Sequence, residues 1–168
     1  MTGYLRFITV PIFVATCTAL IFAQKETVAE LRAKADQGDA VAQYSLGVIY
    51  RDGVGVAQNY AVAVQWHRLA ADQGYAPAQY NLGVMYFQGE GLPMDDVAAY
   101  MWFSLAATRA TGPVRDSAIG AREQTAGYLT SEQLLEAQRL VFEWDAAHPF
   151  PSVSPSSLNR PPLGVRPP

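Results

Sequence analysis

Apolar residues along the middle of the chain recur every three or four positions, which is the spacing of an α-helix rather than of a strand. Ala42, Leu46 and Tyr50 stand four residues apart, and the pattern resumes with Trp66 and Ala70 after an interruption that contains two glycines. Such a break ends one helix and leads into the next. The pattern therefore predicts a unit of helix, loop and helix.

The same unit occurs a second time. When the chain is shifted by 36 residues against itself, 18 of the 36 positions in residues 35–70 match those in residues 71–106. A fixed period of this length is the sequence signature of a helical repeat architecture. The matching residues of the first unit are Ala35, Asp36, Gln37, Gly38, Ala40, Ala42, Gln43, Tyr44, Leu46, Gly47, Val48, Tyr50, Gly53, Gly55, Ala63, Trp66, Leu69 and Ala70.

The loop of each unit predicts where its helices end and begin. Residues 52–58 and 88–94 each contain two glycines, which permit a positive φ and end the first helix. Asn59 and Asp95 follow at the position where a side chain caps the second helix. The boundaries of the two helical hairpins are thereby predicted.

Gly47 and Gly83 fall inside the first helix of each unit, where a glycine costs about 1 kcal/mol relative to alanine. We expect a close approach of two helices to offset that cost. Trp66 and Trp102 are expected to fill the wider gaps between helices.

The motif A-x-A-Q-Y-x-L-G-x-x-Y, followed by a G-x-G loop and a downstream tryptophan at a period of 36 residues, resembles the Sel1-like repeat. The resemblance implies an all-α fold: a short right-handed α/α solenoid of hairpins like those of the tetratricopeptide repeat, with N- and C-terminal capping helices. Ala57 takes the place of Pro93, and Tyr60 that of Asp96. Cysteine-rich relatives linked with β-lactam binding or hydrolysis carry paired cysteines in every repeat, whereas this chain has only Cys17.

Two capping regions flank the repeats of residues 35–70 and 71–106. Residues 24–34 are predicted to form an N-terminal half-repeat that opens with a capping-box sequence at Thr27. Residues 107–148 form the C-terminal cap, since the end of a solenoid meets water rather than a neighbouring repeat.

The C-terminal cap is expected to begin with a break in the repeat register at residues 108–113. One helix then covers Val114 to about Ala126, and a second opens with a capping box from Thr130 to Gln133. This last stretch resembles the cap common in exported bacterial Sel1-repeat proteins. The residues that define its amphipathic pattern are Leu134, Leu135, Ala137, Gln138, Val141, Phe142 and Trp144.

Residues 149–168, which we call the Pro-rich tail, include seven prolines and show no apolar periodicity. This composition predicts disorder with polyproline II character. Arg160 and Arg166 give the tail a charge near +2, because it contains no acidic side chain.

The N-terminal segment predicts export. An uncharged apolar run from Phe7 to Ala23 follows Arg6, and polar residues resume at Gln24, which is typical of a signal peptide covering residues 1–23. An uncleaved membrane anchor is an alternative, and so is lipidation of Cys17, because residues 14–17 resemble a lipobox. Each reading places the repeats in the bacterial cell envelope, as a periplasmic or secreted protein.

Composition and charge exclude several function classes. A net charge of −3 and a pI near 5.3 do not favour binding to nucleic acid or to anionic membranes. His67 and His148 are the only histidines, and neither has a partner at metal-ligand or catalytic spacing. His67 takes the place of Phe103, which indicates a partly buried structural position. We therefore expect no metal, no cofactor and no enzymatic activity.

The first helix of each hairpin offers a candidate binding surface. At 100° per residue, one face of each of these helices collects a stripe of side chains on the concave side of the solenoid, the face that tetratricopeptide grooves use. Side chains shared by both units, such as Tyr44, Val48, Tyr80 and Val84, could equally pack the repeats together. The stripe comprises Val41, Tyr44, Ser45, Val48, Arg51, Asp52, Pro77, Tyr80, Asn81, Val84, Phe87 and Gln88.

These observations predict an exported adaptor that holds a protein or peptide partner. A cell-envelope enzyme or carbohydrate-binding accessory acting on peptidoglycan is the alternative, suggested by the location and the aromatic stripe. A structural homo-oligomer is a further alternative, because two full repeats are close to the minimum for a stable solenoid.

Overall fold

The structure, a computed structural model, describes residues 28–149, and within this range the chain forms helices and no strands. The predicted all-α class is confirmed. The predicted signal peptide, the predicted capping box at Thr27 and the Pro-rich tail after Pro149 lie outside the described residues. Residues 28–36 are helical and are followed by α2 (Ala40–Asp52), α3 (Tyr60–Asp72), α4 (Ala76–Gln88), α5 (Asp96–Arg109), α6 (Gly112–Ala126) and α7 (Ser131–Ala147).

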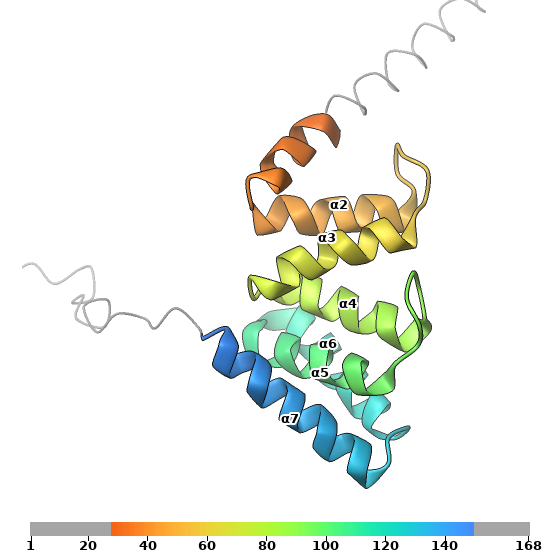
Figure 1. Ribbon diagram of the computed structural model, residues 1–168, viewed down its shortest axis with the longest axis vertical. Helices are drawn as coiled ribbons and strands as arrows, with labels where there is room; N and C mark the ends of the chain where they lie inside the picture. Colours follow the sequence, from red (N-terminus) through yellow and green to blue (C-terminus); the bar gives the residue numbers. More distant parts are fainter. Residues whose placement is uncertain (1–27, 150–168) are drawn as a thin grey trace, which may run out of the picture.

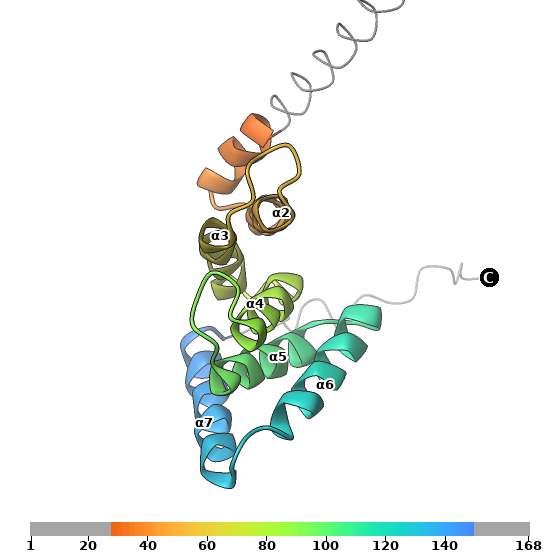
Figure 2. The ribbon, with the colours of Figure 1, turned by 90° about the vertical axis from the view of Figure 1, so that its right-hand side faces the viewer.

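The helices stack into two hairpins and a C-terminal cap (Figure 1). Helix α2 pairs with α3, α4 pairs with α5, and α3 packs on α4 to join the two hairpins. The cap is not a third hairpin of the same kind, because α6 and α7 both pack on α5 and lie on its opposite sides (Figure 2).

Side-chain caps fix the helix starts that the sequence predicts. The Asn59 carboxamide oxygen accepts a hydrogen bond from the amide of Val62 at 3.1 Å, and Asp95 accepts one from Ala98 at 2.9 Å. Each bond satisfies an amide that has no partner within the helix. Both predicted caps are confirmed.

The predicted capping box of the last helix is also confirmed. The hydroxyl of Thr130 accepts a hydrogen bond from the amide of Gln133, whose side chain accepts one from the amide of Thr130. This reciprocal pair starts α7 at Ser131.

Glycines end the first helix of each hairpin as predicted. Gly53 and Gly89 both have φ of 71°, in the left-handed region, and their amides donate to carbonyls of the preceding turn. L-residues with a side chain rarely adopt this backbone conformation, so glycine is the residue of choice here.

The helix-interior glycines accommodate an aromatic ring from the second helix of their own hairpin. A Cβ built on Gly47 would lie 2.5 Å from Nδ1 of His67, and one built on Gly83 would lie 2.7 Å from Cδ1 of Phe103. The predicted close approach of two helices is therefore confirmed. The rings of His67 and Phe103 make this contact. The sequence analysis had named only the tryptophans Trp66 and Trp102 as aromatic residues between the helices.

In each repeat, one buried glutamine of the first helix forms a hydrogen bond to the end of the preceding helix. The side-chain amide of Gln43 donates to the carbonyl of Ala35 at 3.0 Å, and that of Gln79 donates to the carbonyl of Ala71 at 3.1 Å. Each of these carbonyls also accepts a hydrogen bond from a backbone amide, that of Gly38 or Gly74, so the glutamine adds a second bond at the end of the preceding helix. This role explains why a polar residue recurs inside the repeat motif.

The C-terminal cap corrects two sequence expectations. Helix α5 continues through Thr108 to Arg109, and α6 already begins at Gly112, so the break in register is confined to residues 110–111. In α7, Ala137 is buried and Trp144 is partly buried, whereas Leu135 and Phe142 lie in solvent. The apolar residues of α7 thus do not form one buried face.

Arg109 fastens α7 to the second hairpin. Its guanidinium lies 2.6 Å from a carboxylate oxygen of Asp145 and 4.5 Å from the ring centroid of Trp144. It also donates to the carbonyl of His148 at 3.2 Å. Because the Arg109 side chain is almost fully buried, this ion pair and cation–π contact stabilise the packing of α7 on α5.

Candidate functional site

The predicted stripe divides between α2 and α4, the first helices of the two hairpins. Its members differ widely in accessibility. Val41, Asp52 and Gln88 are exposed, whereas Asn81 retains only 8% of its exposure, which leaves little of its side chain for a partner. The half-buried members are Tyr44, Ser45, Val48, Arg51, Pro77, Tyr80, Val84 and Phe87.

The two tyrosines shared by the repeats pack inside the fold. The Tyr44 ring lies 5.6 Å from that of His67 and 5.3 Å from that of Tyr75. The Tyr80 ring lies 5.7 Å from that of Phe103. These tilted contacts are typical of stabilising aromatic pairs, and they favour the packing interpretation for both tyrosines over a role in recognition.

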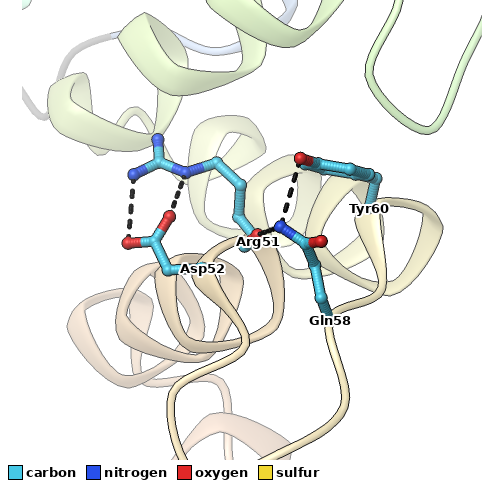
Figure 3. A network of polar contacts seen from close by, with 4 residues as sticks. All are labelled: Arg51, Asp52, Gln58 and Tyr60. Atoms are coloured by element: carbon cyan, nitrogen blue, oxygen red, sulfur yellow. Dashed lines mark hydrogen bonds and ion pairs between the residues drawn. The ribbon is translucent and has the colours of Figure 1, made fainter.

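At the end of α2, the stripe carries a polar network (Figure 3). The Arg51 guanidinium donates to both carboxylate oxygens of Asp52, at 2.8 and 3.4 Å. The Gln58 side chain donates to the Arg51 carbonyl at 2.7 Å and to the Tyr60 hydroxyl at 3.1 Å. The network ties the loop after α2 back onto the helix and fixes the direction of Arg51.

Electrostatics at this end of α2 keep both partners charged. The hydrogen bond from Arg51 lowers the pKa of Asp52, although the small loss of solvation acts in the opposite direction. The same bond raises the pKa of Arg51, with a further contribution from the charge of Glu90. A partner would therefore meet a compact ion pair at the first repeat.

At the equivalent end of α4, the stripe is aromatic. Phe87 occupies the position of Arg51 and lies with its ring 5.8 Å from that of Tyr128, in the turn between α6 and α7. Tyr128 is exposed. The sequence did not assign Tyr128 to the site, because it belongs to the cap and has no counterpart in the repeat pattern.

His67 lies behind the stripe and is fully buried, deeper than the sequence indicated. Among residues 28–149, neither ring nitrogen has a hydrogen-bond partner. Burial lowers the pKa of His67 to about 4, and the charge of Arg51 adds to this effect, while Asp52 opposes it. The ring is therefore neutral at pH 7 and serves packing against Gly47.

Within the described residues, no group of three or more His, Cys, Asp or Glu side chains is placed to hold a metal ion. A search of the same part of the chain finds no helix with the length and hydrophobicity needed to cross a membrane. The stripe itself presents the Arg51–Asp52 ion pair, aliphatic residues such as Val41, and Phe87, which contacts Tyr128 from the turn after α6.

Comparison with known proteins identifies the repeat. A family model described as Sel1 repeat matches residues 40–75 and 76–110, so each match begins at the first residue of α2 or α4. No match was found among curated proteins.

Two solved structures share the fold. One is c5321 of uropathogenic Escherichia coli, described as a protective antigen displaying an SLR fold, with 33% identity over 74% of this chain and a TM-score of 0.69. The other is a Sel1 repeat protein from Oxalobacter formigenes, with 31% identity over 77% of this chain and a TM-score of 0.52. The chain spans 26% of the first protein and 55% of the second. Residues 40–110 of the chain therefore consist of two Sel1 repeats, and the two solved structures that the chain resembles have the same repeat fold.

Proposed function

We propose that the chain is an exported adaptor that holds a protein or peptide against the face formed by α2 and α4. Sel1 repeats generally mediate protein interactions. The observation that carries the proposal is the contrast within these helices: their inward residues repeat, while the accessible positions 41, 51 and 52 differ from 77, 87 and 88. A face that varies while its scaffold is repeated is expected of a recognition surface on a solenoid.

A site-specific crosslinking experiment in the native cell tests this proposal. A photoreactive amino acid replaces Val84, which lies half-buried on α4, or Leu69, which is 48% exposed on α3. We expect a discrete crosslinked product, identified by mass spectrometry, from position 84 and none from position 69. Crosslinks from both positions, or from position 69 alone, would contradict the assignment of the face. Products that contain only this chain would favour the homo-oligomer, and retention on cell-wall fragments would favour the peptidoglycan-binding accessory.

The proposal of export is based on the apolar N-terminal segment, residues 7–23. The mass of the native protein is expected to correspond to a chain that begins at or near Gln24. An intact Met1 would favour an anchor, and a lipid on Cys17 would replace the cleavage hypothesis.

A further inference from the structure

Helix α7 has a second apolar face that nothing within the described residues covers. Leu135 and Phe142 are 68% and 74% exposed. They stand seven residues apart, which places them on one side of the helix, two turns from each other. Val141 and Trp144 meet the core of the second hairpin on another side. The exposed pair therefore contributes nothing to the packing of α7 on the fold.

The surroundings of this face are acidic. Glu132, Glu136 and Glu143 are exposed on the same helix, and Arg139 is the only basic residue of α7. Arg139 is already engaged, because it forms ion pairs with Glu136 and Glu143. Residues 28–149 as a whole contain eight basic and fourteen acidic residues. An occupant of the face should therefore combine apolar side chains with positive charge.

Residues 150–168 have this composition. They contain Arg160 and Arg166 and no acidic side chain, and they follow directly after Pro149 at the end of α7. Their apolar residues outside proline and glycine are Phe150, Val153, Leu158, Leu163 and Val165.

The length of the segment suits the face. An extended chain advances about 3.1 Å per residue and an α-helix about 1.5 Å per residue. A chain that turns back at Pro149 needs about 10 Å to reach the level of Phe142 and about 21 Å to reach that of Leu135. The four residues to Val153 span up to about 12 Å and the nine residues to Leu158 up to about 28 Å, so the segment is long enough for both contacts. The eleven residues to Arg160 span up to about 34 Å, which also covers the distance of about 26 Å to Glu132.

We propose that residues 150–168 dock back along α7, with their aliphatic side chains on Leu135 and Phe142 and with Arg160 beside the glutamates. A second copy of the chain fits the face less well, since two exposed side chains per copy are far from the roughly 800 Å² per partner of a stable interface. A tethered segment needs much less area, because its effective concentration is on the order of millimolar.

Paramagnetic relaxation in the full chain tests the proposal. Ser156→Cys, in a chain that also carries Cys17→Ser, receives a nitroxide label, and the amide signals of ¹⁵N-labelled protein are recorded. We expect signals of residues 135–142 to lose more than half of their intensity, while those of α2, which lies far from this part of α7 (Figure 1), are unchanged. The loss should persist after tenfold dilution.

Charge reversal and mixing supply the controls. Arg160→Glu with Arg166→Glu should restore most of the signal of α7, and Phe142→Ser should do the same without altering the charges. Unchanged α7 signals in the labelled chain would overturn the proposal, and so would broadening that survives the charge reversal. Broadening of ¹⁵N-labelled chains by spin-labelled chains that lack ¹⁵N would also overturn it, in favour of contact between copies.

Discussion

The two repeats share a backbone plan but place different rings in the same slot. In both, a glycine in the first helix receives an aromatic side chain from the second: His67 against Gly47 and Phe103 against Gly83. Both rings are buried, yet a phenyl ring needs no hydrogen bonds, whereas both nitrogens of His67 lack a partner within the described chain. The space beside the glycine therefore accommodates a flat ring of either chemistry. In the first repeat the ring is a histidine, so the fold is expected to lose stability at acidic pH.

A second difference lies at the accessible ends of the first helices. Arg51 pairs with Asp52, whereas Phe87 at the equivalent position contacts Tyr128. Leu46 and Leu82, by contrast, are identical and fully buried. Packing against the second helix requires the same residues in both repeats, whereas the proposed recognition of a partner would benefit from residues that vary.

The largest expected effect tests the part that is repeated. Leu46→Ala and Leu82→Ala should each lower the free energy of unfolding by about 2–5 kcal/mol, as large-to-small changes of fully buried side chains do. Leu69→Ala is the matched control, because this leucine is half exposed, and it should cost well under half as much. Urea unfolding monitored by circular dichroism measures all three. Equal losses at positions 46 and 69 would show that the helix phase is wrong.

The next effect is the pH dependence of stability that His67 is expected to cause in the first repeat. The pKa of His67 is about 4 in the folded chain against an ordinary value of 6.5, so the folded state resists protonation while the unfolded state takes up a proton. The contribution of neutral His67 to the free energy of unfolding is fully present above pH 6.5. As the pH falls towards 4, the free energy of unfolding decreases by up to about 3 kcal/mol. His67→Phe should remove this loss, and Phe103→His should introduce a second one. Unfolding curves of both variants between pH 7 and pH 4 provide the measurement, and an unaltered pH dependence of His67→Phe would refute the assignment.

The close contact between glycine and ring is tested by adding a methyl group to the glycine. Gly47→Ala and Gly83→Ala place a methyl group within 3 Å of the ring, which should cost about 1–3 kcal/mol. Gly120→Ala in α6 is the matched control, because its added methyl group meets open space and should stabilise the helix by up to about 1 kcal/mol. Thermal unfolding compares the three variants. Stabilisation by Gly47→Ala or Gly83→Ala would mean that the ring can move away.

The sequence predicted the repeated features well because they rest on local rules. Helical spacing, the caps at Asn59 and Asp95 and the glycine turns depend on neighbouring residues, and the structure confirms them. The cap was harder to predict because it does not repeat. Leu135 and Phe142 satisfy a helical pattern, but only the position of α7 on α5 decides which side is buried.

The position of the stripe residues on the first helix of each hairpin was predicted, and their role in binding stays a prediction. The helices of the stripe follow from the repeat, but the burial of Asn81 and the contact of Phe87 with Tyr128 depend on how α6 and the turn after it pack. The depth of His67 likewise depends on the partner glycine in another helix, which spacing along one helix does not reveal.

The smallest expected change in stability accompanies the largest expected change in function. Arg51→Ala with Phe87→Ala removes the side chains at one of the three accessible positions where the first helices of the two repeats differ. We expect a loss of about 1 kcal/mol in the free energy of unfolding, since both side chains are half-buried and one belongs to an aromatic pair.

The account is tested most directly by combining this double variant with the crosslinker at Val84 in the native cell. It predicts that the double variant unfolds at nearly the same urea concentration as the unaltered chain and loses the crosslinked partner. A double variant that stays folded and yields the same crosslinked product in the same amount would contradict the claim that the face of α2 and α4 binds the partner.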